Sequence, residues 1–310
     1  MKFNLKNKSV WVTGPNGMVG KSVIKELHGK CDKIFEVSKK KLDLKDQVKV
    51  NNWIRKNKPD AIIMTAAKVG GIYANNKFPA EFIYDNLSIQ NNIIEGARIN
   101  KVKKLIFIGS SCIYPKNCKQ PIKEEYLLTG ELEKTNQWYA VAKIAGIKMI
   151  QAYRRQYNCK YISLMPCNMY GPNDNYHSKN SHVLAALIKK FVEAKKLNKK
   201  IVEIWGTGKP LREFMHVEDF AKAIIFCMSK YNKSEPINIG SGDEITINDL
   251  AIKISKLVKF KGKIIFNKNY PDGTYRKILN SKKIKKIGWR PIISLDNGIS
   301  EAIKSYSKNK

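Results

Sequence analysis

Cysteine, histidine and arginine are scarce in this chain of 310 residues, which has six cysteines, four histidines and seven arginines. The cysteines are scattered and no two have the spacing C-x-x-C, so the sequence favours neither a zinc site nor a disulfide framework. We expect free thiols and no bound metal.

Long apolar runs are also missing. No run approaches the roughly 18 apolar residues that cross a bilayer, and the apolar stretch near the start, "VWV", is too short for a signal peptide. We therefore expect a cytoplasmic protein that does not enter a membrane.

Acidic residues are few, with 26 against 58 basic residues and a formal net charge of +32. A basic surface that displaces counterions is typical of nucleic-acid binding. Here, however, the lysines are spread along the whole chain, and arginine, which binds phosphates and bases through paired hydrogen bonds, is rare. We expect weak attraction to polyanions and no specific nucleic-acid partner.

Strand and helix patterns alternate along most of the chain, which predicts an α/β fold: a Rossmann-type doubly wound parallel sheet with a smaller, discontinuous C-terminal substrate domain. Strands are expected at 9–14, 33–38, 60–67, 104–111, 161–172 and, returning late to the same sheet, 236–242. Helices are expected at 18–29, with Gly29 as the C-cap, and at 81–100 and 137–157. The dinucleotide-binding domain is predicted to take 1–170 plus about 213–242, and the substrate domain about 171–212 plus 243–310.

A glycine-rich turn follows the first predicted strand. In "VTGPNGMVGKSV", Gly14, Gly17 and Gly20 have the spacing G-x-x-G-x-x-G between a strand and a helix. Glycines at this place allow a tight turn and let a pyrophosphate approach the backbone N–H groups of the helix N-terminus. The position of the turn favours dinucleotide binding over a purely structural turn.

The segment "EVSKKKLDL" after the second strand bears on the choice of cofactor. Glu36 could bind the adenosine ribose, which would favour NAD, whereas Ser38 and the lysines 39–41 could hold the 2′-phosphate of NADP. We favour NADP because the lysines lie nearer the expected ribose position, with NAD left open. Asp43 is then a candidate for binding the adenine amino group.

The stretch "YAVAK" places a phenol and an ammonium on one face of a predicted helix. Tyr-x-x-x-Lys begins at Tyr73, Tyr139 and Tyr306, and roughly two matches are expected by chance, so the spacing alone decides little. Only the middle match opens the helix after the fourth strand, whose end presents Ser110. An ammonium from Lys143 would help the phenol to exchange a proton and could bind the nicotinamide ribose. These groups could converge on one substrate carbonyl.

Seven blocks of the sequence, taken in order, resemble the GDP-L-fucose synthase family of the extended short-chain dehydrogenase/reductases. The blocks are "GPNGMVG", "GSSCIYP", "YAVAKIAGIK", "MPCNMYGPNDN", "NSHVLAALI", "WGTGKPLREFMHVEDFA" and "PDGTYRK". The resemblance implies an NADPH-dependent homodimer, built on two long helices, that epimerises a GDP-4-keto-6-deoxy sugar at C3 and C5 and then reduces C4.

The resemblance also implies roles for individual residues. Ser110, Tyr139 and Lys143 would be the reductase triad, with Cys112 and His182 as the acid and base of epimerisation, a pairing of thiol and imidazole suited to proton exchange near neutral pH. The cofactor site would comprise Gly14, Asn16, Gly17, Met18, Val19, Gly20, Ser38, Lys39, Asp43, Leu44, Ala66, Lys143, Pro166, Asn168, Met169 and His182. The GDP-sugar would contact Asn168, Lys190, Trp205, Arg212, Asp272 and Lys277.

Some positions depart from the family pattern and keep alternatives open. Asn16 and Val37 stand where relatives often carry arginines for the 2′-phosphate, and Lys189 and Lys190 replace an arginine near the substrate. One alternative is a C4 reductase that acts on a related GDP-4-keto sugar, such as a heptose, after a separate epimerase. A second is a non-catalytic dinucleotide-sensing protein on the same scaffold.

Overall fold

The computed structural model describes residues 3–177, 181–270 and 272–308. Two of the sequence blocks, 180–188 and 271–277, each begin with a residue outside the described ranges, Asn180 and Pro271 respectively.

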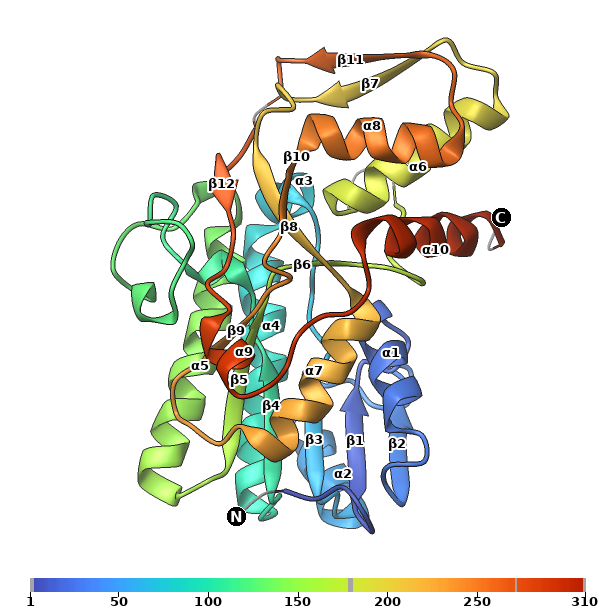
Figure 1. The fold of residues 1–310 in the computed structure, drawn as a ribbon. Coiled ribbons are helices and arrows are strands. Elements are labelled where there is room, and N and C mark those ends of the chain that lie inside the picture. The colour runs from blue at the N-terminus through green and yellow to red at the C-terminus, as the bar shows by residue number, and fades with distance from the viewer. Residues whose placement is uncertain (1–2, 178–180, 271, 309–310) are drawn as a thin grey trace.

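A six-stranded parallel sheet forms the centre of the larger part of the molecule (Figure 1). Its order is β2-β1-β3-β4-β5-β9, and every neighbouring pair is parallel. The strands are β1 (Ser9–Thr13), β2 (Lys33–Val37), β3 (Ala61–Met64), β4 (Lys104–Ile108), β5 (Tyr161–Pro166) and β9 (Ile237–Ile239). The predicted Rossmann-type fold and the late return of 236–242 to the same sheet are confirmed.

Helices connect these strands and cover the sheet. They are α1 (Met18–Leu27), α2 (Gln47–Asn57), α3 (Ile72–Lys77), α4 (Pro79–Ile99), α5 (Gln137–Tyr157) and α7 (Val217–Lys230). α1 packs against α7, while α4 packs against both α2 and α5. The periodicity of 137–157 predicted α5 with its bounds, and Gly29, just after α1, has the positive φ of +73° expected after a helix end.

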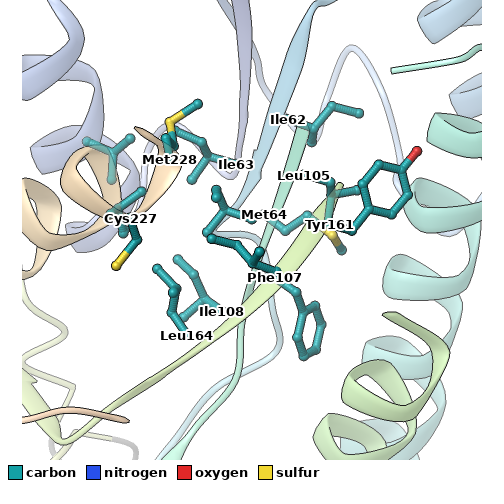
Figure 2. Packing of buried hydrophobic residues seen from close by; sticks show 14 of the residues in the cluster. Ile62, Ile63, Met64, Leu105, Phe107, Ile108, Tyr161, Leu164, Cys227 and Met228 are labelled. Atoms are coloured by element: carbon teal, nitrogen blue, oxygen red, sulfur yellow. The ribbon is translucent and has the colours of Figure 1, made fainter. Parts of the chain in front are cut away.

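The main core lies where helices meet the middle of this sheet. β3 and β4 are buried along their whole length, so both faces are apolar, as expected for a central parallel strand. Figure 2 shows Ile63 of β3 near Met228 of α7, with Leu105 and Tyr161 on neighbouring strands. Each large side chain buried in this way contributes about 1.5–3 kcal/mol.

A second, smaller core lies beyond the carboxyl ends of these strands. Its strands are β6 (Asn168–Tyr170), β7 (Ile201–Trp205), β8 (Leu211–His216), β10 (Glu244–Thr246), β11 (Lys263–Asn267) and β12 (Arg276–Lys277). Its helices are α6 (Val183–Lys196), α8 (Ile247–Val258) and α10 (Leu295–Lys308), while the short α9 (Lys282–Lys286) contacts β9. β8 pairs with β6, β10 and β12, and β7 pairs with β11 (Figure 1).

One strand prediction is wrong in extent. The apolar run 161–172 was expected to be a single strand, but it divides at Cys167. The N–H of Cys167 still donates to Ile239 of β9, after which the chain leaves the large sheet and β6 pairs with β8. Both pieces are apolar because both enter a core, so the pattern does not reveal the change of partner.

Candidate active site

Three predicted catalytic side chains meet where β4 ends. Ser110 is the N-cap of a 3₁₀ turn, η1 (Ser111–Ile113), and its Oγ accepts the N–H of Cys112 at 3.2 Å. Tyr139, in the first turn of α5, hydrogen-bonds the Ser110 side chain and lies near the Cys112 thiol. The structure therefore brings Ser110, Cys112 and Tyr139 together, while their convergence on a substrate carbonyl stays a prediction.

Lys143 lies one turn further along α5 and is held by the backbone. It is 5% exposed, and its Nζ donates to the carbonyl of Ile108 at 2.9 Å and lies 5.8 Å from the centre of the Tyr139 ring. Burial lowers the pKa of Lys143 to about 8. Burial raises the pKa of Tyr139, against the hydrogen bond from Ser110, so the phenol keeps its proton at neutral pH.

Two donors from different parts of the chain surround the Cys112 sulfur. Asn136 Nδ2 lies 3.3 Å from Sγ, and Lys277 Nζ lies 3.6 Å from it. Arg212 is close enough for its charge to interact with the same thiol. A thiol between an amide donor and an ammonium is placed to exchange a proton with a bound substrate.

His182 is the N-cap residue of α6 and is exposed to solvent. Its side chain makes no capping hydrogen bond, yet the surrounding protein desolvates the imidazole and lowers its pKa. The lowered pKa keeps the ring neutral at pH 7, and its side chain does not cap α6.

Arg212 on β8 is fixed beside a loop that ends in Asp272. Its Nη1 donates to the Leu211 carbonyl at 2.9 Å and its Nη2 to the Asp272 carbonyl at 3.3 Å. Burial lowers the pKa of Arg212, although the guanidinium stays charged at neutral pH. The Asp272 carboxylate accepts both the N–H and the hydroxyl of Thr207, each at 2.7 Å, so it holds the loop.

Lys190 and Trp205 form a separate group on the smaller core. Trp205 stacks on Tyr270 with ring centres 4.2 Å apart and planes 10° apart. Lys190 Nζ lies 5.1 Å from the centre of the Trp205 ring and donates to the Glu203 carbonyl at 2.8 Å. The Trp205 ring thus lies between a stacked phenol and an ammonium, a partly exposed aromatic group with a cation over its face.

The glycine-rich turn fits a dinucleotide phosphate. Gly14 has φ of +69°, and a Cβ there would lie 2.9 Å from Cα of Ala66. Gly17 is the N-cap of α1, and a Cβ on it would meet nothing nearer than 3.5 Å, so open space lies in front of the helix. The N–H groups of Met18 and Val19, in the first turn of α1, have no acceptor within the helix and are free to bind an anion.

The end of β2 faces the glycine turn across a cavity of about 400 Å³. Asn16 and Glu36 both line this cavity, together with residues of α1. Ser38 and Lys39 follow in a turn in which the Ser38 carbonyl accepts the N–H of Lys41 and of Leu42. Both predicted ribose partners, the carboxylate and the lysines, are thus near the same turn.

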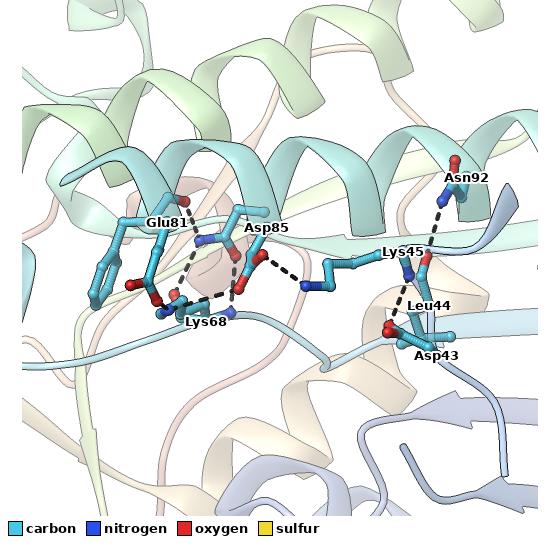
Figure 3. A network of polar contacts seen from close by, with 9 residues as sticks. Asp43, Leu44, Lys45, Lys68, Glu81, Asp85 and Asn92 are labelled. Atoms are coloured by element: carbon cyan, nitrogen blue, oxygen red, sulfur yellow. Dashed lines mark hydrogen bonds and ion pairs between the residues drawn. The ribbon is translucent and has the colours of Figure 1, made fainter. Parts of the chain in front are cut away.

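The predicted adenine-side residues are fixed against α4. Asn92 donates to the Leu44 carbonyl at 3.0 Å, and Asp43 Oδ1 accepts the N–H of Lys45 at 3.0 Å (Figure 3). Lys45 also pairs with Asp85 on α4 at 3.1 Å. These bonds fix the backbone of 43–45 and leave the second Asp43 oxygen without a partner in the part of the chain that the structure describes.

The remaining predicted cofactor residues lie at the carboxyl edge of the large sheet. Ala66 follows β3 and donates to Thr13 Oγ1 at 3.2 Å. Pro166 ends β5, and Asn168 and Met169 begin β6. Asn168 Nδ2 donates to the Glu213 carbonyl at 2.9 Å, which ties β6 to β8.

The described residues also bear on two other features, metal-binding groups and membrane-spanning helices. Within the described ranges, no three His, Cys, Asp or Glu side chains are grouped closely enough to bind a metal ion. In the same ranges, no helix combines the length and the apolar character needed to cross a membrane.

Sequence reasoning missed two residues of this region. Asn136, the donor to Cys112, precedes Tyr139 by three residues, and that spacing of about one turn was the available signal. Glu213 is completely buried beside Arg212, and burial raises its pKa to about 7. β8 also carries Arg212 and His216, so the charge of Glu213 did not stand out in the sequence.

Comparison with known proteins agrees with this geometry. Residues 10–240 match the model of the NAD dependent epimerase/dehydratase family. A GDP-L-fucose synthase from Sinorhizobium fredii is 49% identical over 99% of this chain and 98% of its own length.

Solved structures are similar over the full length. A GDP-6-OMe-4-keto-L-xylo-heptose reductase from Campylobacter jejuni has a TM-score of 0.94 at 33% identity, covering 99% of this chain and 100% of that one. A GDP-L-fucose synthetase from Naegleria fowleri bound to NADP has a TM-score of 0.92 at 28% identity, covering 99% and 97%. Because the family model matches most of the chain and the relatives match it over nearly its whole length, the chain belongs to the NAD dependent epimerase/dehydratase family and, within it, to the GDP-L-fucose synthase family.

Proposed function

We propose that this protein converts a GDP-4-keto-6-deoxy sugar to GDP-L-fucose or a close relative, by epimerisation at C3 and C5 followed by NADPH-dependent reduction of C4. The observation that carries the proposal is the joint placement of the Ser110–Tyr139–Lys143 group and the Cys112 thiol at the end of β4. A reductase needs the first group, whereas an epimerase also needs an acid and a base.

In the reduction step, NADPH supplies the hydride to C4 and the protein supplies the proton. Tyr139, which keeps its proton at neutral pH, donates to the carbonyl oxygen, and Ser110 orients the phenol and the substrate. Lys143, fixed by the Ile108 carbonyl, supports this transfer electrostatically and binds the nicotinamide ribose.

In the epimerisation step, Cys112 and His182 act on the carbons beside the ketone. Protons at these carbons are acidic because the enolate is delocalised, and inversion requires removal on one face of the sugar and delivery on the other. Asn136 and Lys277 hold the sulfur of Cys112. His182, neutral and without a hydrogen bond, serves as its partner.

The cofactor is proposed to be NADP. Lys39, Lys40 and Lys41 are exposed beside the predicted ribose position, and no ion pair of theirs is found within the described residues. A 2′-phosphate would therefore meet positive charge without breaking an existing contact. Titration should give tighter binding of NADPH than of NADH, and replacing the three lysines by glutamine should narrow the difference. A tighter NADH complex would assign the ribose to Glu36 instead.

The decisive experiment measures proton exchange without turnover. The protein is mixed with oxidised cofactor and GDP-4-keto-6-deoxymannose in heavy water, and deuterium at C3 and C5 is read by mass spectrometry and NMR. We expect incorporation by the wild type, strong suppression in Cys112→Ser and impairment in His182→Gln. Both variants should still reduce a ketone that is already epimerised, since the reductase group is untouched.

The second candidate function is C4 reduction without epimerisation. One observation favours it: the C. jejuni heptose reductase shares the fold over 99% of this chain. Wild-type protein that reduces C4 but incorporates no deuterium would select this candidate.

The active unit is proposed to be a homodimer that pairs α4 and α5 of each copy. These helices lie side by side (Figure 1). Both present exposed apolar side chains.

A further inference from the structure

Glu213 links three segments around the candidate site. It lies on β8 directly after Arg212 and is 0% exposed. Its Oε1 accepts the N–H of Gly242 at 2.7 Å, and its Oε2 accepts the N–H of Leu279 at 2.9 Å. The carboxylate therefore joins β8 to the turn after β9 and to the segment after β12.

The fit around this carboxylate is close. A Cβ added at Gly240 would lie 2.3 Å from Glu213 Oε1, so only glycine leaves room for the side chain. Lys285 and Asp243 act on the carboxylate with opposite charges, and the Cys167 thiol also lies within electrostatic reach. Among the described residues, the hydrogen-bond partners of the carboxylate are the backbone N–H groups of Gly242 and Leu279.

The segment that Glu213 holds carries a residue of the site. Leu279 follows Lys277 by two residues, and Lys277 pairs with Arg212 in the parallel register of β12 and β8. β12 has only two residues, so its own ladder fixes it weakly. Lys277 Nζ is the donor 3.6 Å from the Cys112 sulfur.

We propose that Glu213 is a positioning residue. By accepting the N–H of Leu279, it holds β12 in the position in which the ammonium of Lys277 contacts the sulfur of Cys112. The inference rests on the proposed function only for the catalytic importance of Cys112. The contact between Lys277 Nζ and the Cys112 sulfur does not depend on that function. A carboxylate suits this role because both of its oxygens are acceptors, and two backbone donors face it.

The test reads the Cys112 thiol directly and needs no turnover. A neighbouring ammonium favours the thiolate, which is the form that iodoacetamide alkylates. Alkylation of the peptide containing Cys112 is followed by mass spectrometry in the wild type, Lys277→Met and Glu213→Gln. We expect both variants to react more slowly than the wild type, by about tenfold and to a similar degree. In Glu213→Gln the amide NH₂ must face one of the two backbone N–H groups, which displaces the segment.

Ser281→Ala is the matched control. Ser281 is buried and its Oγ accepts the N–H of Gly240 at 2.8 Å, so the variant loses a bond to the same turn while the Leu279 bond remains. We expect thermal destabilisation comparable to that of Glu213→Gln with unchanged alkylation. If Glu213→Gln does not fold, Glu213→Asp takes its place. Its shorter side chain cannot reach the N–H groups of both Gly242 and Leu279, so its Cys112 should also be alkylated more slowly than that of the wild type.

Three results would overturn the inference: alkylation of Cys112 within twofold of wild type in the folded Glu213 variant, equal slowing in Ser281→Ala, or no slowing in Lys277→Met. A failure of the proposed function is recognised separately, because wild-type protein would then incorporate no deuterium. The alkylation rates would still show whether Glu213 positions Lys277 against Cys112.

Discussion

At the scale of single residues, the proposed function gives Tyr139 and the glycine turn separate tasks: the phenol would act on the substrate and the turn would bind the nucleotide. Tyr139→Phe is expected to lower the rate of carbonyl reduction by about 10²–10⁴-fold while the NADPH dissociation constant stays nearly the same. Lys143→Ala should lower both the rate of carbonyl reduction and the affinity for NADPH. Stopped-flow reduction and cofactor titration measure the two quantities. Tyr73→Phe is the control, and near-normal turnover in Tyr139→Phe would show that the wrong tyrosine was chosen.

Lys143 gives the reaction a pH dependence. Its pKa is lowered to about 8, so the ammonium is charged below that pH and neutral above it. If the charge supports proton transfer and ribose binding, kcat/KM for reduction should fall as pH rises through about 8. Lys143→Arg, which stays charged, should not show this fall in kcat/KM, even if its kcat/KM is lower at every pH. A wild-type profile that is flat from pH 7 to about 9 would contradict the role given to Lys143.

Residue-level prediction was possible where one short segment carries the candidate residues, whose catalytic roles stay predictions. Ser110 and Cys112 follow a buried strand, and Tyr139 and Lys143 share a helix face, so the local pattern placed them. Asn136 and Glu213 escaped because their partners, Cys112 and Leu279, are distant in sequence and come near only through the fold.

At the scale of elements, the turn before α1 depends on two glycines in different ways. A Cβ at Gly20 would lie 2.2 Å from the Gly14 carbonyl oxygen, so Gly20→Ala forces the backbone of the turn apart. We expect a loss of about 1–3 kcal/mol in the free energy of unfolding together with loss of NADPH binding. Thermal denaturation and cofactor titration would measure both.

Gly17→Ala is the matched comparison. Gly17 has φ of −75° and space for a methyl group, so stability should change by less than about 1 kcal/mol. The methyl group would nevertheless occupy the approach of the pyrophosphate, and NADPH affinity should fall by roughly tenfold or more. Equal affinity in Gly17→Ala and wild type would mean that the phosphates bind elsewhere.

The strands of the large sheet were predictable because each is an apolar run bounded by polar segments, and α1, α4 and α5 were predictable from their period. The helices α2, α3 and α7 were not predicted from the sequence. The elements of the smaller core were not predictable either. β6, β10 and β12 have only two or three residues each, which is too short for a period, and their partner β8 comes from another part of the chain. The domain boundaries inferred from the broken rhythm stay a prediction.

At the scale of the whole molecule, the proposed dimer can be tested by its exposed surface. Tyr84 and Ile99 on α4 are 65% and 48% exposed, and Trp138, Val141 and Tyr157 add exposed apolar surface on α5. Tyr84→Asp combined with Ile99→Asp should give a monomer in analytical ultracentrifugation, because a charge without a partner is costly inside an interface. Ile292→Asp, which changes a 75% exposed residue outside these helices, should stay dimeric. A monomeric wild type would exclude this assembly.

The last strand of the large sheet also determines the order in which the molecule can be completed during synthesis. β5 ends at Pro166, but its outer neighbour β9 begins only at Ile237, after β6, β7, β8 and the helices between them. At a synthesis rate of 5–20 residues per second, the ribosome needs on the order of several seconds to make the intervening chain. During that time the apolar β5 has an unpaired edge, the kind of surface that promotes aggregation. The backbone groups on that edge of β5 therefore gain their partners only when β9 is made.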